Sequence, residues 1–65
     1  RAARRSLFAA RNLAAGTTIT AADLVALRPG NGIPVSRRDE FIGKTITRPV
    51  KAGYPLRVEH FIHGE

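Results

Sequence analysis

The chain has 65 residues and no cysteine, and eleven Lys and Arg against five Asp and Glu give it a formal net charge of +6. A chain this short forms one domain at most and buries only about 60% of the surface that its unfolded state exposes. Without cysteine, disulfides and thiolate metal sites are excluded. No run approaches the ~20 apolar residues of a membrane span and no signal-peptide core is present, so we predict a soluble chain with no membrane partner.

The positive charge raises the local concentration of anions, which makes nucleic acid the first partner to consider. The basic residues are scattered without a helical stripe, however, and the aromatic residues that could stack on bases are few: Phe8, Phe41, Tyr54 and Phe61. We therefore predict no nucleic-acid partner. Small anionic metabolites, or the acidic rim of a neighbouring domain, suit a diffuse charge better.

The first predicted element is a strand of small and apolar residues over Ser6–Ala10. The segment after it, Arg11–Leu24, resembles a later segment, Arg48–Phe61, at an offset of 37 residues. Each copy predicts a strand, a turn centred on glycine, a short second strand and one helical turn whose last apolar residue enters the core. Two such copies would pack about an approximate dyad.

The helical turn of the first copy carries a capping signal. Thr20 with Asp23 three positions later is close to a capping box, so we predict a turn that begins after Thr20. This turn is short, because Val25–Leu27 resumes an extended run.

A further helical turn is predicted between the two copies, over Ser36–Ile42. Ser36 is expected to cap its start, and Gly43 to end it in the left-handed conformation. The residues that follow, Lys44–Thr47, are predicted to form a strand with Ile46 on one face and threonines on the other.

The loop Leu27–Pro34 lies outside both copies and contains one charged residue, Arg28. Pro29 keeps Arg28 out of the helical region, and the glycines at 30 and 32 allow positive φ and close backbone approach. The five guanidinium donors of Arg28 could recognise a carbonyl, carboxylate or phosphate. The residues alone leave open a local alternative, in which Arg28 caps a carbonyl of its own loop.

Short strands, one-turn helices and frequent Gly and Pro turns indicate a mainly β fold without a long helix. Four motifs occur in order along it: Arg5-Ser6-Leu7-Phe8, then Asn12-Leu13-x-x-Gly16-x-x-Ile19-Thr20-x-x-Asp23-Leu24, then Arg28-Pro29-Gly30-x-Gly32-Ile33, then Gly43-Lys44. Their order and spacing resemble the SAF, or antifreeze-like, domain at the C-terminus of bacterial sialic acid synthases. The resemblance covers the chain from about Arg4 to Ile62.

The resemblance implies a small β-clip, or pretzel, fold with an internal pseudo-twofold repeat over residues 6–62. Residues 1–5 would then be the end of an interdomain linker, and residues 63–65 a C-terminal tail. The chain begins at Arg1 without a methionine, so we expect it to be an excerpt of a longer polypeptide.

The family resemblance also implies a cytoplasmic parent enzyme, a homodimer with a (β/α)8 barrel that is absent here. That barrel condenses phosphoenolpyruvate with an acylamino sugar such as N-acetylmannosamine, using a divalent metal such as Mn or Mg. The SAF domain would close the barrel of the second subunit. Arg28, the matching position, would contact the acylamino group, with Pro29, Gly30, Asn31 and Gly32 as loop support. In this chain itself we predict no catalytic and no metal-binding residue.

Two alternatives use a similar fold. The first is an ice-binding protein like the type III antifreeze proteins, which share Ser6, Ala9, Thr17, Thr20 and Gly32-Ile33-Pro34 with this chain. Ice adsorption needs a flat, weakly polar face, whereas Arg11 would place a hydrated charge there. The second is a SAF interaction module of flagellar or pilus assembly proteins, to which the loop containing Arg28 is less well suited.

Two further features have ordinary interpretations. His60 and His63 have the i, i+3 spacing of metal ligands, but imidazoles near a chain end are more often solvent-facing. Tyr54, at the second glycine turn, is expected to pack as an edge aromatic.

Overall fold

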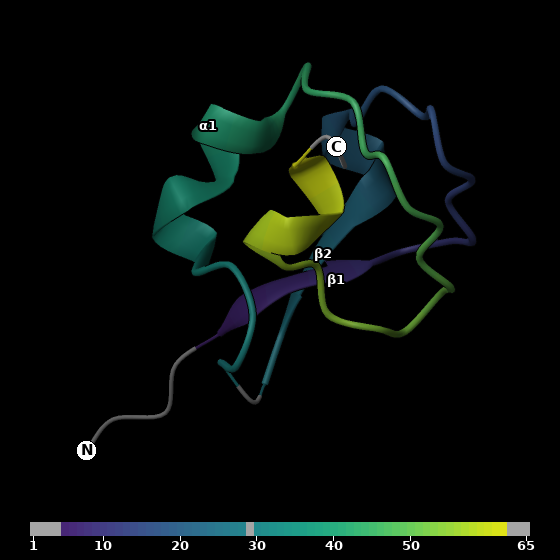
Figure 1. Cartoon of the computed structure of the whole chain (residues 1–65). Helices are drawn as coiled ribbons and strands as arrows, with labels where there is room; N and C mark the ends of the chain where they lie inside the picture. The colour runs from purple at the N-terminus through teal and green to yellow at the C-terminus, as the bar shows by residue number, and fades with distance from the viewer. Residues whose placement is uncertain (1–4, 29, 63–65) are drawn as a thin grey trace.

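The structure, a computed structural model, describes residues 5–28 and 30–62. Its sheet consists of two short antiparallel strands, β1 (Ser6–Ala9) and β2 (Leu24–Leu27), which cross near the middle of the molecule in Figure 1. The register places Ser6 opposite Leu27, so β2 ends beside the start of β1. All of β1 is buried, whereas β2 alternates half-buried and exposed residues. The outer face of the sheet is therefore on β2.

In the part of the chain that the structure describes, four short helical segments accompany the sheet. Three are 3-10 helices, η1 (Ala21–Asp23), η2 (Val35–Arg37) and η3 (Val58–Phe61), and α1 (Arg38–Phe41) is a single α-helical turn. The prediction of a small fold with short strands and one-turn helices is confirmed for the described residues. None of their helices is long and apolar enough to cross a membrane.

The predicted strand over Lys44–Thr47 is wrong, because Thr45 forms one isolated bridge, with Thr18, before the chain bends at residues 47 and 48. Backbone hydrogen bonds join this segment to residues 16–19, but they make a single bridge pair, whereas a strand needs a ladder of several pairs. The predicted alternation nevertheless holds, since Ile46 is fully buried while Thr45 is exposed.

Backbone hydrogen bonds recur at the offset of 37 residues. Gly16 N–H donates to Ile46 O at 2.8 Å, and Gly53 N–H donates to Ala9 O at 2.9 Å. Leu13 and Val50, which align with each other, exchange both backbone hydrogen bonds at 2.7 and 2.9 Å. Two more pairs of bonds correspond in the same way. The bond from Ile46 N–H to Thr17 O corresponds to that from Ala9 N–H to Tyr54 O, and the bond from Ile19 N–H to Lys44 O corresponds to that from Leu56 N–H to Leu7 O. Each segment thus bonds mainly to the opposite half of the chain.

The core draws its apolar residues from both halves. Six leucine and isoleucine residues of the core are at most 2% exposed: Leu7, Leu13, Ile19, Ile33, Ile46 and Leu56. Leu24 and Phe61, the last apolar residues of the two similar segments, are half-buried and pack against this core. The expected direction of both side chains is confirmed, although their burial is partial.

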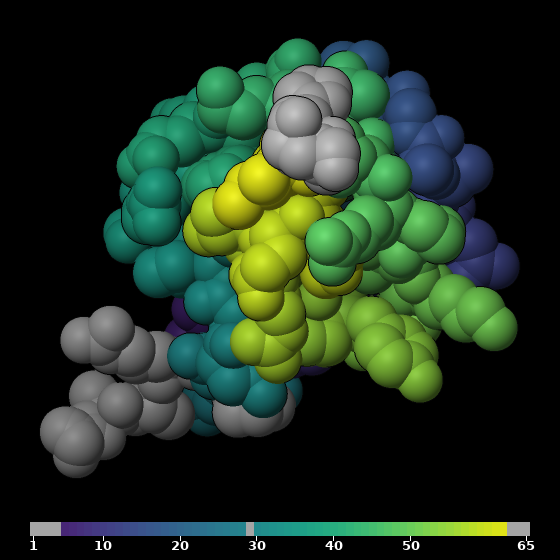
Figure 2. Space-filling view, viewed as in Figure 1, coloured from purple at the N-terminus to yellow at the C-terminus, as the bar shows by residue number. Residues whose placement is uncertain are grey.

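α1 packs beside η3, as Figure 1 shows, and the centroids of the Phe41 and Phe61 rings are 4.8 Å apart. On the face drawn in Figure 2 the yellow C-terminal segment lies between the teal α1 region and the green segment that precedes it. Gly43, at φ +92°, ends the helix in the left-handed conformation as predicted.

The predicted cap at Ser36 is wrong. Pro34 occupies the position before η2 with φ −63°, the value that the proline ring fixes, so the helical turn already begins at Val35. No side chain caps η2 or α1. An exposed ion pair between Arg37 and Glu40, at 2.9 Å, spans the turn instead.

Candidate functional site

Arg28 directly follows β2, at the end of the sheet. Its side chain is exposed, and it forms no hydrogen bond or ion pair with any residue of the described ranges 5–28 and 30–62. The guanidinium donors can therefore reach an acceptor outside this part of the chain. Pro29, the first of its predicted supporting residues, lies outside the described residues.

After Arg28 the chain returns along residues 55–57. Ile33 N–H donates to Leu56 O at 2.9 Å, and Nη1 of Arg57 donates to Asn31 O at 2.8 Å. A Cβ on Gly32 would stand 2.6 Å from Leu56 O, so only glycine permits this approach without a shift. The close approach expected at Gly32 is thus present, whereas its φ is not positive. The substrate-contact roles of Arg28 and of the loop stay predictions.

Arg57 is the residue of this region that sequence reasoning leaves without a role. The similar segments align Arg57 with Thr20 and His60 with Asp23, and the structure gives these pairs corresponding bonds. Thr20 N–H donates to Asp23 Oδ2 and Arg57 N–H donates to His60 Nδ1, both at 2.9 Å. One signal in the sequence could have identified it: Arg57, with a long side chain that donates hydrogen bonds, stands where the first segment has the capping residue Thr20.

Asp23 is 2% exposed, yet its carboxylate is well satisfied. It accepts hydrogen bonds from the backbone and hydroxyl of Thr20 and, at 2.8 Å, from Nε of Arg11. The Thr20 backbone bond is the main cause that lowers the pKa of Asp23, against the opposing effect of its burial. Asp23 is therefore an ionised helix cap, as the capping signal predicts.

His60 is the corresponding cap of η3. Burial lowers its pKa, the charges of Arg48 and Arg57 act in the same direction, and Glu59 acts in the opposite one. A neutral imidazole is also what the geometry requires, because Nδ1 accepts a hydrogen bond and must carry no proton. The second segment therefore has a neutral cap where the first has an anion.

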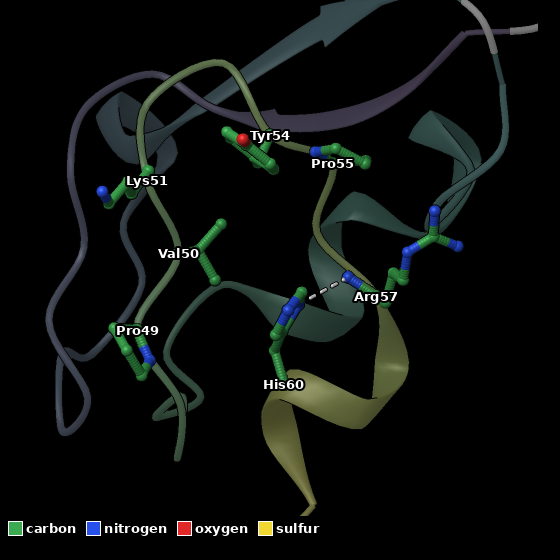
Figure 3. Close-up of a pocket in the computed structure, with 7 residues that line it drawn as sticks. All are labelled: Pro49, Val50, Lys51, Tyr54, Pro55, Arg57 and His60. Carbon is green, nitrogen blue, oxygen red and sulfur yellow. Dashed lines mark hydrogen bonds between the residues drawn. The ribbon is translucent and has the colours of Figure 1, made fainter.

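A hollow of about 490 Å³ lies beside the His60 cap (Figure 3). It is lined by Pro49, Val50, Lys51, Tyr54, Pro55, Arg57 and His60. In Figure 3 the side chains of Lys51 and Arg57 extend in opposite directions, away from the middle of the hollow. The two cations consequently flank an apolar surface and do not converge on one point.

Two expectations about this region are corrected. Tyr54 is not a packed edge aromatic, because it is 63% exposed, at the turn that follows Gly53. His60 is not solvent-facing but half-buried, while His63 lies outside the described residues. Within the described ranges, no three His, Cys, Asp or Glu residues are grouped to hold a metal ion.

The chain belongs to the SAF domain family, whose model matches residues 4–62. The chain is similar to part of N,N'-diacetyllegionaminic acid synthase of Legionella pneumophila, with 39% identity over 57 residues. The match covers 88% of this chain and 16% of that synthase. The predicted resemblance to the SAF domain of a sialic-acid-type synthase is confirmed.

Proposed function

We propose that this SAF domain is an accessory domain of a nonulosonic acid synthase of the sialic acid type. In this proposal it closes the barrel active site of a second subunit, and Arg28 contacts the acylamino group of the sugar substrate. The observation that carries the proposal is the exposed Arg28, without a partner in the described residues, in a chain 39% identical to part of such a synthase.

The chemistry of Arg28 suits an acylamino sugar. A guanidinium can donate to an amide oxygen directly or through one water, and a charged donor makes a stronger bond than a neutral one. The loop after Arg28 is bonded to residues 56 and 57, which reduces the entropy cost of ordering it on binding.

The outer face of β2 supports docking against another surface. Val25 and Leu27, two residues apart on this face, are 37% and 43% exposed, and they lead directly to Arg28. Alternate residues of a strand share a face, so these side chains form a small apolar patch next to the charge. A second subunit that covers this patch would bring Arg28 into its active site.

The proposal assigns the reaction chemistry to the barrel. A divalent metal, Mn or Mg, and phosphoenolpyruvate would bind there, and this chain would contribute sugar binding and closure. Turnover by the 65-residue chain by itself would contradict this division.

We also infer that the fold is the β-clip, with a pseudo-twofold axis that relates Arg11–Leu24 to Arg48–Phe61. The support is the set of corresponding hydrogen bonds, above all the mutual pair between Leu13 and Val50. A residue that pairs with its own counterpart lies next to the axis that relates the two.

Arg28→Ala in the homodimeric synthase that contains this chain tests the proposal. If the contact is desolvated, the variant should lose about 2–4 kcal/mol in kcat/KM for the acylamino sugar, with little change in KM for phosphoenolpyruvate. Arg28→Lys should recover part of the loss, because it keeps the charge but not the planar donor set. Arg48→Ala, an exposed arginine elsewhere, is the matched control. Unchanged kinetics for Arg28→Ala would remove Arg28 from the site.

A further inference from the structure

We propose that Arg57 is a positioning residue, which holds the loop containing Arg28 through its hydrogen bond to Asn31 O. Its effect on loop order stands on the geometry of this chain. Its effect on sugar binding rests on the function proposed above.

The backbone of Arg57 is fixed by its neighbours. Leu56 N–H donates to Leu7 O at 2.8 Å and Leu56 O accepts from Ile33 N–H at 2.9 Å, while Arg57 N–H donates to His60 Nδ1 at 2.9 Å. The side chain of Arg57 therefore extends from a point that is bonded to β1, to the loop and to η3. Because the backbone is already ordered, binding a carbonyl costs only the rotamer freedom of the Arg57 side chain.

The target of this guanidinium is a backbone carbonyl three residues after Arg28. Asn31 O accepts from Nη1 of Arg57 at 2.8 Å, across 26 residues of sequence. Within the described ranges, no other side chain donates a hydrogen bond to residues 30–32. The next backbone bond of the returning chain is that of Ile33, so Arg57 extends the anchored region by two residues toward Arg28.

Arg57 contributes little to the core, since its side chain is exposed. Its truncation should therefore free the loop without unfolding the domain. The aligned position in the first segment is Thr20, which has no side chain long enough to reach a loop in this way. Both positions donate a backbone N–H to their cap, but only Arg57 also has a side chain that bonds to the loop.

The first test measures loop order by NMR relaxation on the 65-residue chain. In Arg57→Ala the backbone order parameters of Gly30 and Asn31 should fall from near 0.85 to below about 0.6, with those of β1 unchanged. Arg57→Lys should restore much of the order, because its ammonium can also donate to Asn31 O. Arg48→Ala, which removes an equal charge, should change neither the order parameters of Gly30 and Asn31 nor those of β1. Unchanged order parameters in Arg57→Ala, or an equal loss in Arg48→Ala, would overturn the proposal.

The second test uses the synthase that contains this chain. Arg57→Ala should raise KM for the sugar by roughly tenfold, and the double variant Arg28→Ala/Arg57→Ala should be no worse than Arg28→Ala alone. Additive losses in the double variant would show that Arg57 does not act through Arg28.

The two proposals fail differently. If Arg28→Ala is harmless, the proposed function fails and the relaxation data alone decide the role of Arg57. If Arg28→Ala impairs sugar binding and Arg57→Ala does not, the positioning proposal fails and the proposed function stands.

Discussion

The two similar segments of the chain begin their helical turns with the same backbone hydrogen bond but with different acceptor side chains. In the first, the buried Asp23 carboxylate accepts the Thr20 N–H and pairs with Arg11. In the second, the neutral His60 accepts the Arg57 N–H and has the positive charge of Arg48 nearby. The backbone bonds correspond at both turns, so the fold constrains the backbone while the side chains are free to differ.

The difference has a structural consequence outside the turns. In the first segment the arginine side chain, that of Arg11, bonds to the cap Asp23 itself. In the second segment the arginine side chain, that of Arg57, bonds to Asn31 O in the loop that follows Arg28. One copy of the capping pattern therefore bonds only within itself, and the other bonds to the loop for which we propose sugar binding. Four predictions separate these roles.

Asp23→Ala should destabilise the domain most, by about 3 kcal/mol, because it leaves the Thr20 N–H without an acceptor and removes a charge-assisted bond from Arg11. Urea unfolding followed by circular dichroism measures this loss. Asp39→Ala, which removes an exposed carboxylate, is the control and should change the free energy of unfolding by less than about 0.5 kcal/mol. A loss no larger than the control would contradict the capping role.

Gly32→Ala should cost about 2 kcal/mol and also displace the loop, since its Cβ would meet Leu56 O at 2.6 Å. Gly16→Ala is the matched change in the first segment. Nothing lies within 4 Å of its Cβ, but its φ of +92° is strained for alanine, so about 1 kcal/mol is expected. The same unfolding experiment compares the two, and NMR shifts at Asn31 should move in Gly32→Ala alone.

His60→Asp would give the second segment the cap of the first. The new carboxylate can accept the Arg57 N–H and attract Arg48, so stability at neutral pH should be kept or raised by up to about 1 kcal/mol. His60→Ala, without any acceptor, should instead lose about 1 kcal/mol. Thermal unfolding at pH 7.5 distinguishes them, and an equal loss in both variants would contradict the correspondence of the two caps.

The smallest expected effect is the dependence of stability on pH. Because the folded state lowers the pKa of His60, the unfolded chain binds more protons, and stability falls as the pH drops from about 6.5 through the lowered value. The lowered pKa of Asp23 adds a second loss only below about pH 3.8. Unfolding curves at pH 7.5, 5 and 3 measure both steps, and the first step should be absent in His60→Asp. A first step that persists in that variant would assign it to another group.

Much of the fold follows from local signals in the sequence. The strand predicted from the small and apolar residues Ser6–Ala10, the Thr20–Asp23 cap and the left-handed Gly43 all depend on neighbouring residues, and all three are found in the structure, the strand as Ser6–Ala9. The offset of 37 residues also pointed to the aligned pair Leu13 and Val50, which exchange backbone bonds. Signals of this kind need no knowledge of the tertiary fold.

The errors came where tertiary contacts decide. The segment Lys44–Thr47 has alternating residues, but its bonds to residues 16–19 make a single bridge pair, which periodicity cannot reveal. Ser36 has the chemistry of a cap, yet Pro34 starts the helical turn earlier. Arg57 stayed without a role because its partner, Asn31 O, is a backbone atom brought near by folding. The exposure of Tyr54 also depends on which residues folding brings near it, so the residue type alone does not predict it.

The hydrogen bonds that join Gly16 to Ile46 and Gly53 to Ala9 also determine how the chain must fold. Since these bonds lie between the halves, neither half can form them before the two meet, although β1 and β2 pair within the first half. Closure of long loops has to precede these contacts, which is typical of slow folding for so short a chain. Fragments cut between Gly32 and Ile33 would each lack the bonding partners that the other half supplies, so we expect neither to keep the native fold separately and the fold to return only when they are mixed.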